Sequence, residues 1–182
     1  MTETTTPTHV TGDLALRLLD PVADLDLVHD WVRQPRAEFW GMRDKPREEV
    51  GEIYAWLQDQ DHLCAYLVLV DGTPVGIFQT YDPAVDEIGR HYERREGDLG
   101  IHLFLADTAV RSGRTAQILR FLIGWVGAGG RVRRLVAEPD AANEASLARL
   151  DRLGFTAGPV AQLPDKVAQF FFLDVDGSAQ PG

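Results

Sequence analysis

The chain has 182 residues, of which 45% are hydrophobic and 25% charged, and these proportions are typical of a soluble globular domain with a sizeable core. Its formal net charge of −10 argues against nucleic acid or an anionic membrane as a partner. No apolar run approaches the roughly 18 residues of a membrane span and no signal peptide is visible, which indicates a cytoplasmic protein.

We expect disordered tails at residues 1–12 and 177–182, and a single domain over residues 13–176 that exists as a monomer or weak homodimer. Cys64 is the only cysteine, so no internal disulfide can form. The histidines show no metal-ligand spacing, and no metal site is therefore expected.

The first half of the chain predicts strands and helices in alternation. In chain order these are a strand over 14–20, a helix capped by Asp20 that ends before Pro35, a helix from Pro46 to about Gln60, and two strands that meet at Asp71-Gly72. An Asp-Gly pair between two apolar runs is the clearest hairpin signal in the sequence.

The second half begins with the strand "DLGIHLFLA" and a helix whose inner face carries Ile118, Leu122 and Val126. The strand "RVRRLVAE" follows, then a helix with Asp140 as its N-cap and Gly154 as its closing residue. Two strands, "FTAGPVAQLP" and "VAQFFFLDV", complete the chain. This order predicts an α/β (α+β) fold with a mixed, twisted central sheet of about seven strands and helices on both faces.

Three stretches are candidates for chemistry, and the first is a loop before a helix. Ser112 and Gly113 place free backbone amides beside Arg111 and Arg114, an arrangement that suits the phosphates of an anionic ligand. On these residues alone, a solvated turn with two surface arginines is the preferred interpretation.

The second candidate is His102, which lies centrally in an otherwise apolar strand. A histidine in such a run is more often a hydrogen-bonded core residue, but one that faces a cleft can act as a general base. The third candidate combines aromatic and acidic residues that would suit a cationic amine: Glu38, Phe39, Trp40, Tyr81, Asp86, Glu87 and Tyr92. A polar loop with core aromatics is the alternative for this group.

Four stretches together resemble the Gcn5-related N-acetyltransferase (GNAT) superfamily, and within it the branch of siderophore-biosynthesis acyltransferases that modify hydroxylysine for aerobactin and lysine in mycobactin. They are "EFWGM", "DEIGRHYERREGDLGIHLFL", "VAEPDAANEASLARLDRLGF" and "LPDK", which span roughly residues 38 to 166. The pattern Asp-x-Gly-x-His followed by Glu-Pro-Asp-x-x-Asn is the specific part of this resemblance.

The resemblance implies a role for each matching residue. His102 and Asp140 would be the catalytic pair, and the backbone of Leu103, Phe104 and Leu105 would contact the thioester. The loop Val110–Thr115, which includes Arg111, Ser112, Gly113, Arg114 and Thr115, would cradle the coenzyme A pyrophosphate, and Asn143 would lie near the pantetheine arm. The acceptor side would include Phe39, Trp40, Gln79, Tyr81, Glu87 and Tyr92.

Two departures from the family pattern qualify these roles. The loop "VRSGRT" keeps only the central Gly113, so phosphate binding would depend more on Arg111 and Arg114. Gln79 stands where this branch often has a glutamate, which leaves the acceptor open.

The function that the resemblance implies is N-acylation of a small amine or N-hydroxyamine of the lysine, ornithine or cadaverine type. Acetyl-CoA or another acyl-CoA would be the co-substrate, without a metal. The alternatives are an aminoglycoside 6′-type or other small-amine acetyltransferase, and a non-catalytic acyl-CoA-binding module.

Overall fold

The structure, a computed structural model, describes residues 8–175, which form two compact units. The first unit comprises residues 8–80 and 102–122, and the second comprises 81–101 and 123–175. Strand β5 (Asp98–Leu105) and helix α3 (Thr115–Gly127) each contribute residues to both units. The tail expected at 177–182, and residues 1–7 of the other expected tail, lie outside the described residues.

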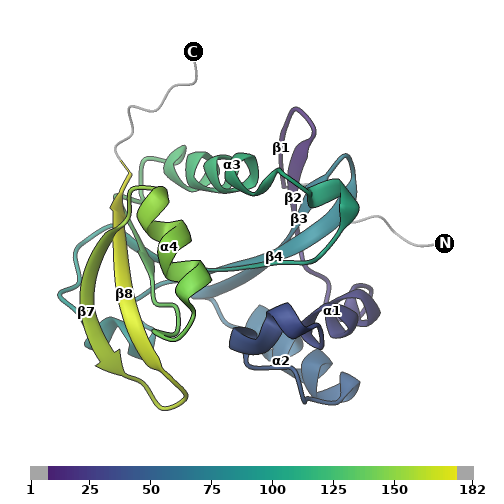
Figure 1. The fold of residues 1–182 in the computed structure, drawn as a ribbon, viewed down its shortest axis with the longest axis horizontal. Helices are drawn as coiled ribbons and strands as arrows, with labels where there is room; N and C mark the ends of the chain where they lie inside the picture. The colour runs from purple at the N-terminus through teal and green to yellow at the C-terminus, as the bar shows by residue number, and fades with distance from the viewer. Residues whose placement is uncertain (1–7, 176–182) are drawn as a thin grey trace. The chain divides into compact units, whose positions relative to one another are not determined.

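The first unit contains a sheet in the order β1-β2-β3-β4-β5, in which β1 pairs antiparallel with β2 and β2 with β3. Its elements are β1 (His9–Thr11), β2 (Leu14–Leu18), α1 (Leu25–Val32), the 3-10 helix η1 (Pro35–Trp40), α2 (Arg47–Gln58), β3 (Leu63–Val70), β4 (Thr73–Tyr81) up to Thr80, the end of β5, the 3-10 helix η3 (Ala109–Arg111) and the start of α3. Figure 1 shows α1 and α2 on one side of β4 and the start of α3 on the other.

The core of this unit lies between the sheet and the helices α1 and α2. Val28 of α1 and Val50 of α2 pack with Leu67 of β3 and Ile77 of β4, and all four are buried. These positions follow the apolar helical and strand periodicities, so burial of one face stabilises both kinds of element.

The second unit contains the order β5-β6-β8-β7, with β5 parallel to β6 and the other pairs antiparallel. Its further elements are the 3-10 helix η2 (Glu87–Arg90), the end of α3, β6 (Arg134–Ala137), α4 (Glu144–Arg152), β7 (Thr156–Gln162) and β8 (Val167–Asp174). Val136, Leu163, Ala168 and Phe170 form its buried cluster.

Helix α4 ends at a glycine, as the sequence predicts. Gly154 has φ of +86°, and its N–H donates to the carbonyl of Asp151 while the N–H of Phe155 donates to that of Leu150. This pair of bonds is the Schellman arrangement, which requires a left-handed residue, and Phe155 is buried behind it.

The hairpin at Asp71-Gly72 is confirmed as well, with positive φ at both residues.

Two local features differ from the expectation. His9–Thr11, inside the expected tail, pair with β2 and bring the strands of the described residues to eight, where about seven were expected. Helix α1 begins at Leu25 rather than directly after Asp20. The Asp20 carboxylate instead accepts from the N–H groups of Val22 and Ala23, and so caps a turn that precedes the helix.

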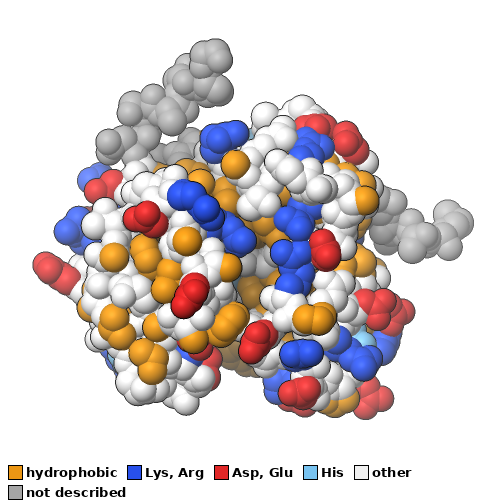
Figure 2. Space-filling view, viewed as in Figure 1, with side chains coloured by type: hydrophobic (Ala, Val, Ile, Leu, Met, Phe, Trp, Pro, Cys, Tyr) orange, Lys and Arg blue, Asp and Glu red, His pale blue; other side chains and the backbone are white. Residues whose placement is uncertain are grey.

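Charged side chains of both signs are interspersed on the face drawn in Figure 2. None of the helices in residues 8–175 is long and apolar enough to cross a membrane.

Candidate functional site

The expected phosphate loop lies between β5 and α3 in the first unit. Gly113 is exposed with φ of +73°, and a Cβ added there would meet nothing within 4 Å. The helical bonds of α3 begin with the one from the N–H of Ile118 to the carbonyl of Arg114, so the amides of residues 115–117 precede the helical ladder. Thr108 adds a buried Oγ1 that has no hydrogen-bond partner among the described residues. The loop therefore offers backbone and hydroxyl groups that a phosphorylated ligand can use.

Arg111 is bonded within this loop. Its Nε donates to the carbonyl of Ala106 at 2.6 Å and its Nη1 to Thr115 Oγ1 at 3.0 Å, while Nη2 lies 3.6 Å from Asp107 Oδ1. Only 14% of the side chain is exposed. Arg111 thus connects the end of β5 to the first residue of α3.

Arg114 is paired with acidic residues from two turns that are distant in sequence. Its guanidinium forms ion pairs with Asp13, in the β1–β2 turn, and with Asp71 at 3.4 Å, and its Nε donates to Gln117. The expected direct contact of Arg111 and Arg114 with phosphate stays a prediction, because both guanidinium groups already have partners in the protein.

His102 lies on β5 in the first unit, and its side chain is half-buried. Phe104 and Leu105 beyond it are buried, and the N–H of Ala106 donates to the carbonyl of Val75 on β4. In the second unit, the parallel ladder between β5 and β6 contains three residue pairs and ends at Gly100 and Val136. Strand β5 continues to Leu105, so its last residues extend beyond that ladder.

Asp98, two residues before Gly100, has a structural role. Its carboxylate accepts from Arg134 Nε at 2.7 Å and from Tyr92 Oη at 3.0 Å, and its side chain is 3% exposed. Burial alone would raise the pKa of Asp98, but these bonds and the N–H of Arg95 outweigh it and lower the pKa below its usual 3.8.

Gly100 is needed because the ring of Tyr81 lies directly on it. A Cβ added at Gly100 would be 1.9 Å from Tyr81 Cζ. Tyr81 is buried, and its hydroxyl donates to Glu138 Oε2 at 2.7 Å. Burial and the Glu138 carboxylate raise the pKa of Tyr81 well above its usual 10.0. The glycine of the Asp-x-Gly-x-His motif therefore makes room for a tyrosine bonded to the glutamate of Glu-Pro-Asp.

Glu138 belongs to the Glu-Pro-Asp motif, but no role was predicted for it. It follows β6, is 2% exposed, and has Lys166 Nζ 3.7 Å from its Oε1. Two sequence signals were available, namely the position of Glu138 in the Glu-Pro-Asp motif and the presence of Lys166 in the "LPDK" stretch. Neither indicates that Glu138 and Lys166 contact each other.

Asp140 is not the N-cap of α4, and that prediction is wrong. The N-cap is Asn143, whose Oδ1 accepts from the N–H of Ser146 at 3.1 Å. Asp140 is half-buried, and its Oδ1 accepts from the N–H of Ala142 at 2.8 Å.

The expected contact of Asn143 with the pantetheine arm stays a prediction, since its side-chain oxygen caps the helix. His102 and Asp140 belong to different units, and their pairing is likewise a prediction.

The expected acceptor residues are divided between the units. In the first, Phe39 is exposed, Gln79 is half-buried, and Trp40 donates to Tyr54 Oη at 3.2 Å with its ring 5.6 Å from that of Phe104.

In the second unit, Tyr81 is buried, whereas Glu87 is exposed and lies 3.6 Å from Arg90. The Tyr92 ring packs 5.2 Å from the rings of both Phe170 and Phe172. Tyr81 and Tyr92 are therefore bonded and packed inside the second unit, and their contact with an acceptor stays a prediction.

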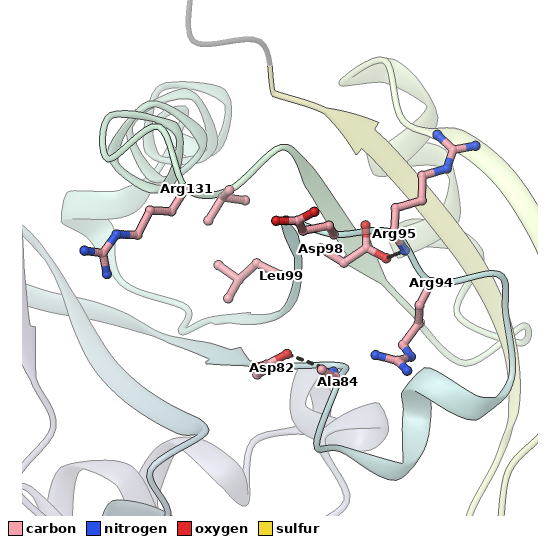
Figure 3. A pocket seen from close by; sticks show the side chains of 10 residues that line it. Asp82, Ala84, Arg94, Arg95, Asp98, Leu99 and Arg131 are labelled. Atoms are coloured by element: carbon pink, nitrogen blue, oxygen red, sulfur yellow. Dashed lines mark hydrogen bonds between the residues drawn. The ribbon is translucent and has the colours of Figure 1, made fainter.

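The second unit also contains a pocket of about 510 Å³ near the start of β5, lined by Arg94, Arg95, Arg131 and Asp98 among others. Figure 3 shows the three arginine side chains pointing in different directions, so they do not converge on one anion. None of the expected site residues lines this pocket. Among residues 8–175, no group of three or more His, Cys, Asp or Glu side chains is placed to hold a metal ion.

The fold is similar to those of solved acetyltransferases. An aminoglycoside acetyltransferase, AAC(6')-Ib, in complex with ribostamycin and coenzyme A matches with a TM-score of 0.79 and 21% identity over 94% of this chain and 100% of that chain. An uncharacterised protein of Bacillus halodurans matches with a TM-score of 0.82 and 22% identity over 88% of this chain and 83% of that chain. At these identities the similarity concerns the fold alone.

Curated relatives are similar in sequence. The N-hydroxyputrescine acetyltransferase of Acinetobacter baumannii is 29% identical over 69% of this chain and 61% of its own length. The N(6)-hydroxylysine O-acetyltransferase of Escherichia coli is 27% identical over 88% of this chain and 52% of its own. The lysine N-acyltransferase MbtK of Mycobacterium sp. is 27% identical over 71% of this chain and 54% of its own. The chain thus spans about half to three fifths of these relatives. Residues 20–163 match the family described as the Acetyltransferase (GNAT) domain, and because this match covers most of the chain, the chain belongs to that family.

Proposed function

We propose that the chain transfers an acyl group from acetyl-CoA or another acyl-CoA to the side-chain amine or hydroxylamine of a lysine-, ornithine- or cadaverine-type molecule in hydroxamate siderophore biosynthesis. One observation carries this proposal. The curated relatives that match the chain bear names of enzymes for N-hydroxyputrescine, N(6)-hydroxylysine, N5-hydroxyornithine and lysine. A small diamine skeleton, in most cases N-hydroxylated, is common to all of these names.

The acyl donor would be bound at the loop before α3. The exposed Gly113, the amides before Ile118 and the buried Thr108 hydroxyl are suited to phosphate and pantetheine oxygens. Because Arg111 and Arg114 are already paired inside the protein, we propose that backbone amides make the principal phosphate contacts. Arg111 then acts on the donor indirectly, by holding the loop to the end of β5.

In the reaction, the acceptor nitrogen attacks the thioester carbonyl while His102, oriented by Asp140, takes its proton. The C–S bond then breaks, and coenzyme A leaves as a thiolate that takes up this proton. The end of β5 extends beyond its ladder with β6, so amides of Leu103 to Leu105 are candidates for bonds to the thioester oxygen as charge develops there. An N-hydroxylamine is less basic than an alkylamine and arrives uncharged, which suits a histidine base. The product is a hydroxamate, an iron-binding group.

Two alternatives make different predictions. The similarity to aminoglycoside acetyltransferases concerns the fold alone, so it favours an aminoglycoside acceptor less than the named relatives favour a diamine. A non-catalytic acyl-CoA-binding module would bind coenzyme A without turnover.

The test is thiol release from acetyl-CoA with a panel of acceptors. The panel contains N-hydroxylysine, N-hydroxyornithine, N-hydroxycadaverine, their parent amines, and kanamycin as the aminoglycoside. We expect the largest kcat/KM for an N-hydroxylated diamine. Preference for kanamycin would support the first alternative, and coenzyme A binding without thiol release from any acceptor would support the second.

A further inference from the structure

The Glu138 carboxylate contacts side chains from two other segments of its unit. It lies at the end of β6, Tyr81 at the end of β4 donates to its Oε2 at 2.7 Å, and Lys166 between β7 and β8 lies 3.7 Å from its Oε1. The exposed fraction of the Glu138 side chain is 1% and that of Lys166 is 21%. Each carboxylate oxygen thus has its own partner, one from the end of β4 and the other from the connection between β7 and β8.

The three residues after Glu138 are held by backbone bonds to β8. The N–H of Gln169 donates to the carbonyl of Pro139 at 3.0 Å, and the N–H of Ala141 donates to the carbonyl of Val167 at 2.8 Å. Between them, Asp140 forms an isolated antiparallel bridge with Ala168. The segment is therefore fixed by the Glu138 side chain at its start and by β8 along its length.

We propose that Glu138 is a positioning residue for Asp140, in that its bonds to Tyr81 and Lys166 fix the backbone from which the Asp140 side chain projects. This inference rests on the proposed function in so far as Asp140 is expected to act in catalysis. Pro139 cannot donate a backbone bond, so the strand loses one anchor where it leaves β6. The buried carboxylate supplies a directional anchor at that point.

An apolar residue would fill the same space without this constraint. Burying a carboxylate requires partners for both oxygens, and its replacement by a well-packed apolar residue is often neutral or favourable for stability. A purely structural role therefore gives no reason for a charged group at position 138. A requirement for one defined geometry at Asp140 gives such a reason.

The kinetic test compares Glu138→Gln with Asp98→Asn. Both substitutions neutralise one buried carboxylate of the second unit that pairs with a basic residue, and Asp98 holds Arg134 rather than the segment before α4. Displacement of a catalytic group by about 1 Å can cost on the order of 100-fold in rate. We therefore expect Glu138→Gln to lower kcat by about 10- to 100-fold with unchanged acyl-CoA KM, equally for N-hydroxylysine and N-hydroxycadaverine. Asp98→Asn should lower thermal stability without this loss of kcat.

Amide hydrogen exchange at Ala141 and Gln169 tests the same inference without relying on turnover. We expect both amides to exchange faster in Glu138→Gln than in Asp98→Asn, and Tyr81→Phe to reproduce part of that change. Equal exchange in the two carboxylate variants would overturn the positioning role. A kcat loss confined to N-hydroxylysine, which has a carboxylate that N-hydroxycadaverine lacks, would also overturn it, because it would indicate direct contact with the acceptor. If the wild type acylates no acceptor, the proposed function fails, and hydrogen exchange alone decides this inference.

Discussion

Gly100→Ala tests the packing that links the two sequence motifs. The added Cβ would lie 1.9 Å from Tyr81 Cζ and 2.2 Å from Cε1 and Cε2, whereas carbon atoms pack at about 3.5–4.0 Å. The Tyr81 ring or the strand must therefore move by about 1.6–2.1 Å, which is enough to break the 2.7 Å bond to Glu138. Overpacking costs about 1–3 kcal/mol, and loss of a hydrogen bond to a charged group about 1.5–3 kcal/mol.

We therefore expect Gly100→Ala to lower the free energy of unfolding by about 2.5–6 kcal/mol, a large part of the roughly 5–15 kcal/mol of a typical domain. Urea denaturation followed by circular dichroism measures this change. The matched control is Gly124→Ala on α3, where an added Cβ meets nothing within 4 Å, and it should stabilise the protein by up to about 1 kcal/mol.

A double-mutant cycle decides whether the Tyr81 ring is the cause. In a Tyr81→Ala background the clash is absent, so Gly100→Ala should then cost about 1 kcal/mol or less. A Gly100→Ala protein as stable as the wild type would refute the reasoning. So would an undiminished cost of Gly100→Ala in the Tyr81→Ala background.

Because the pKa of Asp98 is lowered on folding, the ionised carboxylate stabilises the protein above about pH 4, and this contribution is lost as the pH falls through the folded-state pKa. Urea unfolding between pH 3 and 6 should therefore show a weaker pH dependence of stability for Asp98→Asn than for the wild type. The double substitution Asp13→Asn with Asp71→Asn frees Arg114 and removes two negative charges near the loop, so calorimetry should show tighter acyl-CoA binding. Weaker binding would indicate that the phosphates are bound elsewhere. Trp40→Ala should raise the acceptor KM more than the acyl-CoA KM, and a fall in stability with both constants unchanged would assign Trp40 to the core alone.

Features set by local sequence could be predicted. The Asp71-Gly72 hairpin and the helix end at Gly154 depend on residues that tolerate positive φ, and both are where the sequence places them. The face of α3 was also predictable from its period, since Ile118, Leu122 and Val126 are all buried.

Features set by distant partners could not be predicted. Asp140 and Asn143 are both good N-cap residues, and the choice between them follows from the bond of Ala141 to Val167 on another strand. Arg114 resembles a free phosphate ligand in the sequence, but its partner Asp13 lies 101 residues away. The sequence shows how many charges a stretch carries, whereas the fold determines which of them are paired.

The same reasoning applies to Glu138. The sequence shows that a proline directly follows Glu138, but the partner of the buried carboxylate is Tyr81, 57 residues earlier. A glutamate beside a catalytic candidate was visible in the sequence, and its partners were not.

The most direct test of the account is hydroxamate formation from acetyl-CoA and an N-hydroxylated diamine, measured by mass spectrometry for the wild type and for His102→Ala. General-base catalysis typically contributes about 10²–10⁴-fold. We expect the wild type to form the hydroxamate, and His102→Ala to form it roughly 10²–10⁴-fold more slowly while binding acyl-CoA with unchanged affinity. Equal rates for the two proteins would contradict the histidine-base mechanism, and no hydroxamate from the wild type with any N-hydroxylated diamine would contradict the proposed function itself.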